Sequence, residues 1–447
     1  MKRVVLLSGL ILLVASVAFP QTVNLEQART LALANSRSLA KYNLALRSSV
    51  LDERSQLYTM LPSISAGYSA SMNYMNRDWE FVNPGDTFNA GFDIAITQKI
   101  FEGGKSFIQK AITAIATESV RKEALAEYFN VLDAADNAYY AALEAAATLE
   151  AEELSLRAAL AGLAVAEIRQ GSGMINRGDF LKALADKEAR ENSRDQARRS
   201  LSLCRMKLKA LTGIETSAVL EQVNFDAYED LIRILAGISD EDVDALYDRF
   251  WKLLVQANPS LARAALNSQR AEKNLSLAKR DFSPTISATL FSSGINYSAA
   301  DGFSSSSGGG LAIRGSIPVD FWVLGNKIEK SRIARDSSAL DYKSAETNLE
   351  TELQSSLLNA FAYAGTVIHS RLSLEYVEKH FEYVNERYRL SQSSISDLGD
   401  AATLLINSRN SHIKARYGFL QALSKLRSLG AIDDEQKMIR ILTNEGT

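Results

Sequence analysis

The chain has 447 residues, 46% of them hydrophobic and 23% charged, and this composition excludes an intrinsically disordered polypeptide. Its formal net charge of -3 supplies no broad cationic surface, which excludes nucleic acid as the expected partner. The only cysteine, Cys204, cannot form a disulfide within one chain, and we interpret it as a small buried hydrophobe. Packing alone must hold the fold.

Residues 1–18 have the features of a secretory signal peptide. Lys2-Arg3 precedes an apolar stretch from Val4 to Val14, and Ser16-Val17-Ala18 offers a small-residue cleavage site. The apolar stretch is shorter than the ~18–20 residues of a membrane-spanning helix, so we expect cleavage rather than anchoring, with the mature chain beginning near Phe19. Because no later run of 18 apolar residues exists, the exported protein is either soluble or crosses a membrane as a β-barrel.

The chain contains two copies of one pattern, 222 residues apart. Leu39 and Pro62 are separated by 23 residues, and so are Leu261 and Pro284. A fixed offset of this kind indicates a duplicated domain. We predict a first structural repeat at 19–213 and a second at 241–430, with residues 214–240 and 431–447 outside both.

Each repeat is predicted to contain a helix, two strands and then two very long helices. Lys105–Ala161 contains neither Gly nor Pro over 57 residues, enough for a helix of roughly 85 Å. Apolar residues from Leu125 to Ala146 follow alternating steps of four and three, the spacing of a coiled coil, with one polar interruption at Asp136. We expect the long helices at about 105–168 and 178–212 in the first repeat and about 326–390 and 398–429 in the second.

Four segments alternate apolar with small polar residues, the pattern of β-strands with two different faces. The alternation is complete over 12 residues in Ser63–Tyr74. It is weakest near Ser292, where a bulge or a strand end is expected. Loops are expected at Met75–Thr87 and Ser298–Gly309. We place the strands at about 63–74 and 88–100 in the first repeat and about 285–297 and 310–320 in the second.

Strands of this length and pattern are typical of membrane β-barrels with a wet lumen, although two soluble hairpins would show the same alternation. Four strands per chain cannot close a barrel, and open edges in lipid would leave unpaired backbone groups. We therefore expect oligomerisation. Three chains would give 12 strands, whereas two would give eight and fill the interior with side chains. The predicted fold is mainly α with a β-barrel portion.

Short signatures occupy corresponding places in the two repeats. One is Ser394-Ile395-Ser396-Asp397-Leu398-Gly399-Asp400-Ala401, with Gly173–Phe180 as its counterpart, and the fourth helices end in Ala210-Leu211-Thr212-Gly213 and Arg427-Ser428-Leu429-Gly430. With the duplication and the order of elements, these signatures resemble the TolC-like outer membrane factors, the outer membrane efflux protein family. The resemblance covers Asn24 to Ile432.

The resemblance implies a homotrimer in the outer membrane, with a 12-stranded transmembrane barrel that continues into a helical tunnel in the periplasm. It implies the exit duct of a tripartite efflux pump or a type I secretion system, opened by a periplasmic adaptor (membrane fusion) protein and an inner-membrane pump. Outer-membrane lipid would surround the barrel. Residues 214–240 and 431–447 would form an equatorial belt. The sequence identifies neither the cargo nor the pump.

Asp397 and Asp400 are the main candidates for a periplasmic gate. Their i, i+3 spacing allows both to face one side of a helix, and three chains would place six carboxylates around a narrow opening that attracts cations. The alternative is that Asp397 caps a helix start and Asp400 is a solvated first-turn acid. The resemblance also assigns Asp179 and Tyr388 to holding the mouth shut.

The family's mouth is locked by an arginine paired with an acid, and Ser393 occupies the position of that arginine here. This departure puts an ionic lock in doubt. Closure by packing, or by Arg387 or Arg389, is the alternative.

We expect no enzyme and no cofactor, because the sequence carries no nucleophile, metal or phosphate signature. The three histidines, His369, His380 and His412, lack a paired ligand spacing and are interpreted as surface or packing residues. The main alternative function is a soluble periplasmic coiled-coil scaffold or adaptor. Such a protein would need no strands with a continuous apolar face and would extract into buffer without detergent. An exported hydrolase would need a convergent acid, base and nucleophile.

Overall fold

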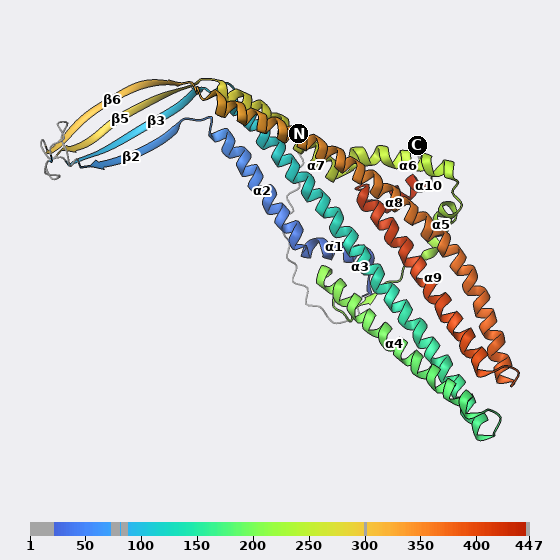
Figure 1. The fold of residues 1–447 in the computed structure, drawn as a ribbon. Helices are drawn as coiled ribbons and strands as arrows, with labels where there is room; N and C mark the ends of the chain where they lie inside the picture. Colours follow the sequence, from blue (N-terminus) through green and yellow to red (C-terminus); the bar gives the residue numbers. More distant parts are fainter. Residues whose placement is uncertain (1–21, 73–80, 82–87, 299–301, 444–447) are drawn as a thin grey trace.

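The computed structural model describes residues 22–72, 81, 88–298 and 302–443 of the chain. The predicted signal peptide and nearly all of the predicted loop at 75–87 lie outside these residues. The described chain is elongated and bent, with a sheet at one end and bundled helices along the rest of its length (Figure 1). None of the helices in the described ranges combines the length and the apolar character needed to cross a membrane.

Both repeats have the same order of elements. The first contains β1 (Thr22–Val23), α1 (Leu25–Asn35), α2 (Arg37–Tyr58), β2 (Ser63–Ser71), β3 (Asn89–Phe101), α3 (Lys105–Gly171) and α4 (Arg177–Thr212). The connecting segment contains β4 (Val219–Leu220), η2 (Phe225–Tyr228) and α5 (Glu229–Ala236). The second contains α6 (Asp240–Ala257), α7 (Pro259–Lys279), η3 (Arg280–Phe282), β5 (Thr285–Ser298), β6 (Gly302–Ser316), α8 (Phe321–Arg389) and α9 (Ile395–Leu429), followed by α10 (Glu435–Thr443).

Two predicted boundaries in the second repeat are wrong. Strand β6 begins at Gly302 instead of about residue 310, so most of the loop expected at Ser298–Gly309 belongs to the hairpin. Serine and glycine favour loops, but backbone pairing with β5 overrides that preference here. Helix α8 begins at Phe321, five residues before the predicted start at 326, because Gly325 is accommodated within its first turns.

Strand β3 passes into α3 through Gly103 and Gly104, both with positive φ, at +62° and +78°. Gly103 is required for a second reason, since a Cβ at this position would collide with the side chain of Ser283 from the second repeat. The two repeats therefore meet closely where the sheet joins the helices.

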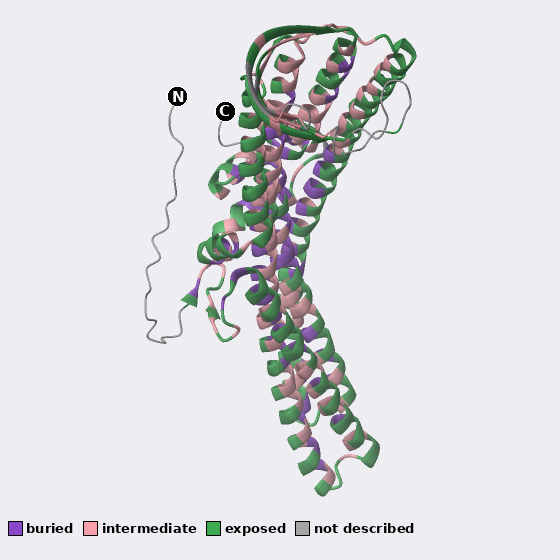
Figure 2. Ribbon diagram, turned by 90° about the vertical axis from the view of Figure 1, so that its left-hand side faces the viewer, coloured by how far each residue is buried: buried purple, intermediate pink, exposed green. Residues whose placement is uncertain are grey.

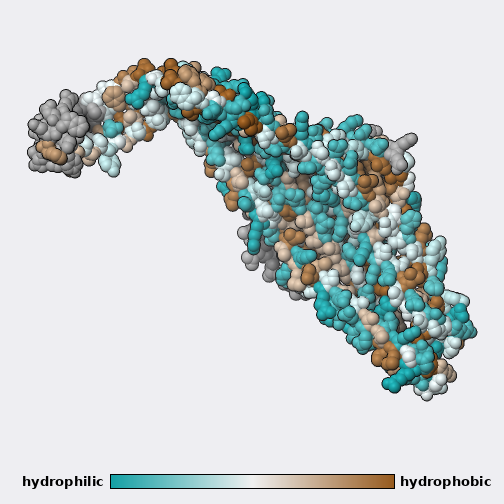
Figure 3. Space-filling view, in the orientation of Figure 1, coloured by the Kyte–Doolittle hydropathy of each residue, from teal (hydrophilic) through white to brown (hydrophobic). Residues whose placement is uncertain are grey.

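The four long strands form one antiparallel sheet in the order β2-β3-β5-β6. Ile64, Ile96, Leu290 and Leu311 lie opposite one another in register and form one row of the apolar face. Ile64 is 75% exposed and Leu311 67% exposed in the single chain. Figure 3 shows hydrophobic residues along the sheet and at its junction with the helices. The predicted bulge near Ser292 is confirmed as a register shift between Ser293 and Ile295.

The long helices pack in two antiparallel pairs, α3 with α4 and α8 with α9, and α3 also packs on α7 and α9. Buried residues concentrate at the middle of the bundle, where α5 and α10 contact each other and cover the long helices (Figure 2). The segments outside the two repeats thus meet on one side of the waist.

A buried charge cluster lies at this waist. Asp136 of α3 has no exposed surface. Its Oδ1 accepts from Arg29 Nε of α1 at 2.6 Å, and its Oδ2 accepts from Arg427 Nη2 of α9 at 2.6 Å. Ser424 Oγ donates to Oδ2 at 2.9 Å. The polar interruption in the coiled-coil pattern is therefore the point that joins α1, α3 and α9.

We predict that Asp136→Asn destabilises the chain by about 3–5 kcal/mol, because it leaves buried guanidinium groups without their counter-charge. Arg427 loses its only ion-pair partner among the described residues, whereas Arg29 retains Glu26 and Glu435. Denaturant unfolding in detergent, followed by circular dichroism, measures the loss. The matched control Glu118→Gln removes surface ion pairs with Arg121 and Lys122 and should cost no more than about 1 kcal/mol. Equal effects of the two substitutions would contradict the role of Asp136.

Candidate functional site at the paired helical turns

Two tight turns close the long helical hairpins at the end of the molecule opposite the sheet (Figure 1). Their hydrogen bonds repeat with an offset of 218 residues: Met174 N donates to Arg169 O at 2.8 Å, and Gln392 N donates to Arg387 O at 2.8 Å. Gly173 and Ser391 have φ values of +71° and +62° at equivalent positions. Ser391 carries a Cβ in the left-handed region, so its backbone is the strained member of the pair.

The helices that follow the turns begin with side-chain caps. Asn176 Oδ1 accepts from Asp179 N at 2.9 Å, and Ser394 Oγ accepts from Asp397 N at 3.1 Å. Asp397 Oδ2 in turn accepts from Ser394 N at 2.9 Å, which completes a capping box. Hydrogen bonding from the Ser394 backbone lowers the pKa of the Asp397 carboxyl below its ordinary value. Asp397 thus lies in the first turn of α9, as the N3 partner of the Ser394 cap.

Asp397 and Asp400 are both exposed near the first turn of α9, so their carboxylates remain available to solvent or to another molecule. Asp179 is half-buried at the equivalent position of α4. Of the three predicted carboxylates, only Asp179 influences Tyr388 electrostatically within the single chain. The structure therefore brings two of the four predicted residues together and leaves the other two on the surface.

Tyr388 is the buried centre of the site, with 2% of its surface exposed. The guanidinium of Arg169 lies 4.4 Å from the centre of its ring, donates to the Tyr388 carbonyl, and approaches the Arg389 carbonyl at 3.5 Å. Burial raises the pKa of Tyr388, which the Arg169 charge opposes and the Asp179 charge reinforces. Arg169 thus fastens the end of α3 to the end of α8.

Sequence reasoning missed Arg169. It considered Arg387 and Arg389 instead, but Arg387 donates to Gln392 O at 3.0 Å within its own hairpin, and among the described contacts Arg389 takes part through its carbonyl alone. Arg169 and Arg387 occupy equivalent positions, 218 residues apart. This equivalence in the sequence could have identified Arg169 as a further candidate. Ser393, in the place of the family's arginine, donates to Val384 O at 3.4 Å.

Two adjacent clefts lie between the helical pairs, on the side of the turns that faces the waist. One has a volume of about 310 Å³ and includes Asp400, and the other has a volume of about 480 Å³. Ala158, Phe381 and Ala402 line both, so the clefts form one groove, which we call the inter-hairpin groove.

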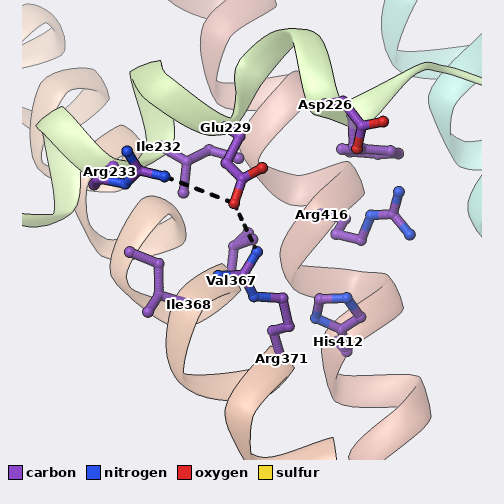
Figure 4. A pocket seen from close by; sticks show the side chains of 10 residues that line it. Asp226, Glu229, Ile232, Arg233, Val367, Ile368, Arg371, His412 and Arg416 are labelled. Atoms are coloured by element: carbon purple, nitrogen blue, oxygen red, sulfur yellow. Dashed lines mark hydrogen bonds and ion pairs between the residues drawn. The ribbon is translucent and has the colours of Figure 1, made fainter. Parts of the chain in front are cut away.

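A separate cavity of about 220 Å³ lies at the waist, between α5 and the α8–α9 pair. Glu229 is paired there with Arg371 at 3.0 Å and with Arg233 at 3.9 Å (Figure 4). His412 Nδ1 lies 3.0 Å from Ser370 Oγ, and burial, reinforced by Arg416 and Arg371, lowers the pKa of His412 to about 4. His412 is a neutral packing residue at pH 7. Among the described residues, no three metal-ligating side chains converge.

Residues 251–431 match the family model for the outer membrane efflux protein. No curated protein matches the chain. Among solved structures, CusC has 17% identity and a TM-score of 0.77, with 91% of each chain covered. The Campylobacter jejuni CmeC outer membrane channel has 15% identity and a TM-score of 0.76, with 95% of this chain and 90% of that chain covered. The outer membrane protein VceC of Vibrio cholerae has 15% identity and a TM-score of 0.75, with 91% and 96% covered.

The solved structures show that the chain has the fold of outer-membrane channels such as CmeC. The second repeat carries the outer membrane efflux protein domain, and the family resemblance predicted from the motifs is confirmed. The fold class, mainly α with a barrel-type strand portion, is confirmed as well. At this level of identity the solved structures establish the fold.

We predict that Asp397→Ala accelerates hydrogen exchange at Ser394 and Asp397, because both amides lose order when the capping box is broken. The folded pKa of Asp397 is lowered, so its capping contribution is complete above the ordinary Asp pKa of about 3.9 and is lost as pH falls through the folded value. Wild-type protection of residues 391–398 should therefore fall on strong acidification, after correction for intrinsic rates. Asp400→Ala is the matched control, and a similar loss in that variant would refute the assignment.

Proposed function

We propose that this chain is one subunit of an outer-membrane exit duct, through which substrate passes passively from a tripartite efflux pump or a type I secretion system. The observation that carries the proposal is the sheet. Its apolar face is exposed, with Tyr68 89% and Ile313 69% accessible, and it is continuous with helices of 67 and 69 residues. An apolar face of this kind suits lipid, and the helices suit a conduit across the periplasm.

The sheet also supports assembly as a homotrimer. In the described part of the chain, β2 and β6 each pair with one strand only, so both edges of the sheet are open. Open edges in lipid cost several kcal/mol for each unpaired backbone group. Pairing β6 of one copy with β2 of the next removes the edges, and three copies close 12 strands.

Exposed apolar stripes on the helices favour the same assembly. Leu44, Leu51 and Tyr58 recur every seven residues on α2 and are 58–65% exposed. Ile333 and Leu340 repeat the seven-residue step on α8, at 61% and 64%. Heptad stripes of this kind suit a neighbouring helix. We propose that α2 of one copy packs on α8 of the next.

The inter-hairpin groove supports a periplasmic adaptor as the partner at the helical end. Ala158 and Ala402 allow close approach of a helix, and Phe381 provides an apolar contact between them. An adaptor bound there would touch both hairpins and so sense or alter their separation. The inner-membrane pump would act through that adaptor.

Closure of the duct is assigned to contacts at the turns. Arg169 holds α3 against α8 within one copy, and Asp397 and Asp400 supply six exposed carboxylates to a trimer's mouth. Packing around Tyr388 replaces the lock that Ser393 cannot form.

A soluble periplasmic scaffold is the alternative function. Long helices and the inter-hairpin groove would serve it equally well. The exposed apolar face of the sheet would not, because a face of this size left in water promotes aggregation. A need for detergent during extraction separates the two functions.

We predict that the purified protein forms small cation-selective channels in a planar bilayer. Hexaamminecobalt(III), added on the helical side, should block them, and the double variant Asp397→Ala, Asp400→Ala should weaken the block by at least about tenfold, because the carboxylates that attract the cation are gone. If the protein stays soluble without detergent and never conducts, the exit-duct function is refuted and the soluble periplasmic scaffold remains.

We predict that Arg169→Ala raises single-channel conductance severalfold, because the ends of α3 and α8 lose their connection. The same bilayer recording measures it. Arg121→Ala is the matched control, since Arg121 is exposed and pairs only with Glu118 of its own helix among the described contacts. Conductance equal to wild type in both variants would remove Arg169 from the closure mechanism.

A further inference from the structure

The face of the sheet opposite the apolar rows carries few charged residues, and their positions are fixed by strand register. Lys99 pairs with Ser287, and Ser287 pairs with Arg314, so these three residues form one row at the helical end of the sheet. Residues directly opposite one another on neighbouring strands share a face. Thr97 and Thr289 lie on this same face, two residues along their strands from Lys99 and Ser287, and their Oγ1 atoms are 3.1 Å apart.

Asp93 lies on the same face, further from the helices. It pairs with Gly67 on one side and with Ser293 on the other. On β5, Ser293 lies six positions after Ser287, about 20 Å along the strand. The face therefore has a basic row near the helices and a carboxylate well beyond it.

Two side chains of this face, those of Asp93 and Phe291, lie against the neighbouring strand. Asp93 Oδ1 is 2.7 Å from the position that a Cβ on Gly67 would occupy, and Phe291 Cζ is 2.7 Å from the corresponding position on Gly310. Each side chain thus lies across a glycine of the next strand. These glycines keep the space above the sheet free, which is what the wall of a passage requires.

The charges of the basic row are accessible. Arg314 is exposed, and none of the described residues forms an ion pair with it. Lys99 Nζ pairs with Glu102 at 2.7 Å, yet its side chain remains 57% exposed. The row therefore keeps a net positive charge, carried chiefly by Arg314.

We propose that Lys99 and Arg314 form an anion-attracting ring at the inner end of the barrel lumen, that Asp93 forms a cation-attracting ring beyond it, and that the two rings set the charge selectivity of the passage. This inference rests on the proposed trimeric duct. Three copies place six cationic groups at one level, three of them paired with Glu102, and three Asp93 carboxylates at the other. Anionic groups of a passing solute, such as carboxylate or phosphate, are the ligands of the inner ring.

The test is the reversal potential of wild-type and variant channels in a KCl gradient. Arg314→Glu should raise the ratio of potassium to chloride permeability by at least about twofold, because three positive charges become three negative ones around the lumen. Asp93→Asn should lower the same ratio. Both shifts should shrink near 1 M salt, where the screening length is about 3 Å. Inorganic pyrophosphate added on the helical side should reduce the current of wild type more than that of Arg314→Glu.

Lys437→Glu is the matched control, since Lys437 is exposed on α10 at the waist and undergoes the same charge reversal away from the sheet. If wild type conducts but Arg314→Glu and Asp93→Asn behave like this control, the inference is wrong and the duct stands. If wild type does not conduct at all, the proposed function fails and the inference fails with it. Arg314→Gln, which removes charge without adding an acid, should give a smaller shift in the same direction.

Discussion

The arrangement of the helices depends on one buried carboxylate. Asp136 lies between guanidinium groups from α1 and α9, and the Ser424 hydroxyl donates a further hydrogen bond to its Oδ2. A buried charge is tolerated only when it is paired and hydrogen-bonded, so the three helices must approach from fixed directions. The cluster joins the first repeat to the end of the second at the waist. The sheet and the turns are held at opposite ends of helices that this cluster positions.

Duplication gives the molecule two equivalent halves, and the turns show where the halves have diverged. The backbone hydrogen bonds of the two turns superimpose residue by residue with a constant offset. The side chains do not, because Arg169 crosses to the other hairpin and Arg387 remains on its own. The two turns therefore make chemically different contacts, although both arise from the same duplicated pattern.

Much of the fold could be predicted from the sequence because its signals are periodic. A long stretch without Gly or Pro predicts α3, a stretch with few glycines predicts most of α8, and strict alternation predicts β2 and β3. The start of β6 could not be predicted, since a Ser- and Gly-rich segment is ordered there only by its pairing with β5. At the site, the capping role of Asp397 follows from local spacing. Arg169 does not, because its contact with Tyr388 joins residues 219 positions apart and depends on the packing of two hairpins.

The unbroken length of α3 has a mechanical consequence. Between Asp136 and Arg169 the helix runs for 33 residues, a lever arm of about 50 Å from the waist to its tip. A tilt of only about 5° around the waist would displace that tip by about 4 Å, more than the length of a hydrogen bond. Small adjustments among the side chains around Asp136 are therefore amplified into separations large enough to part Arg169 from Tyr388.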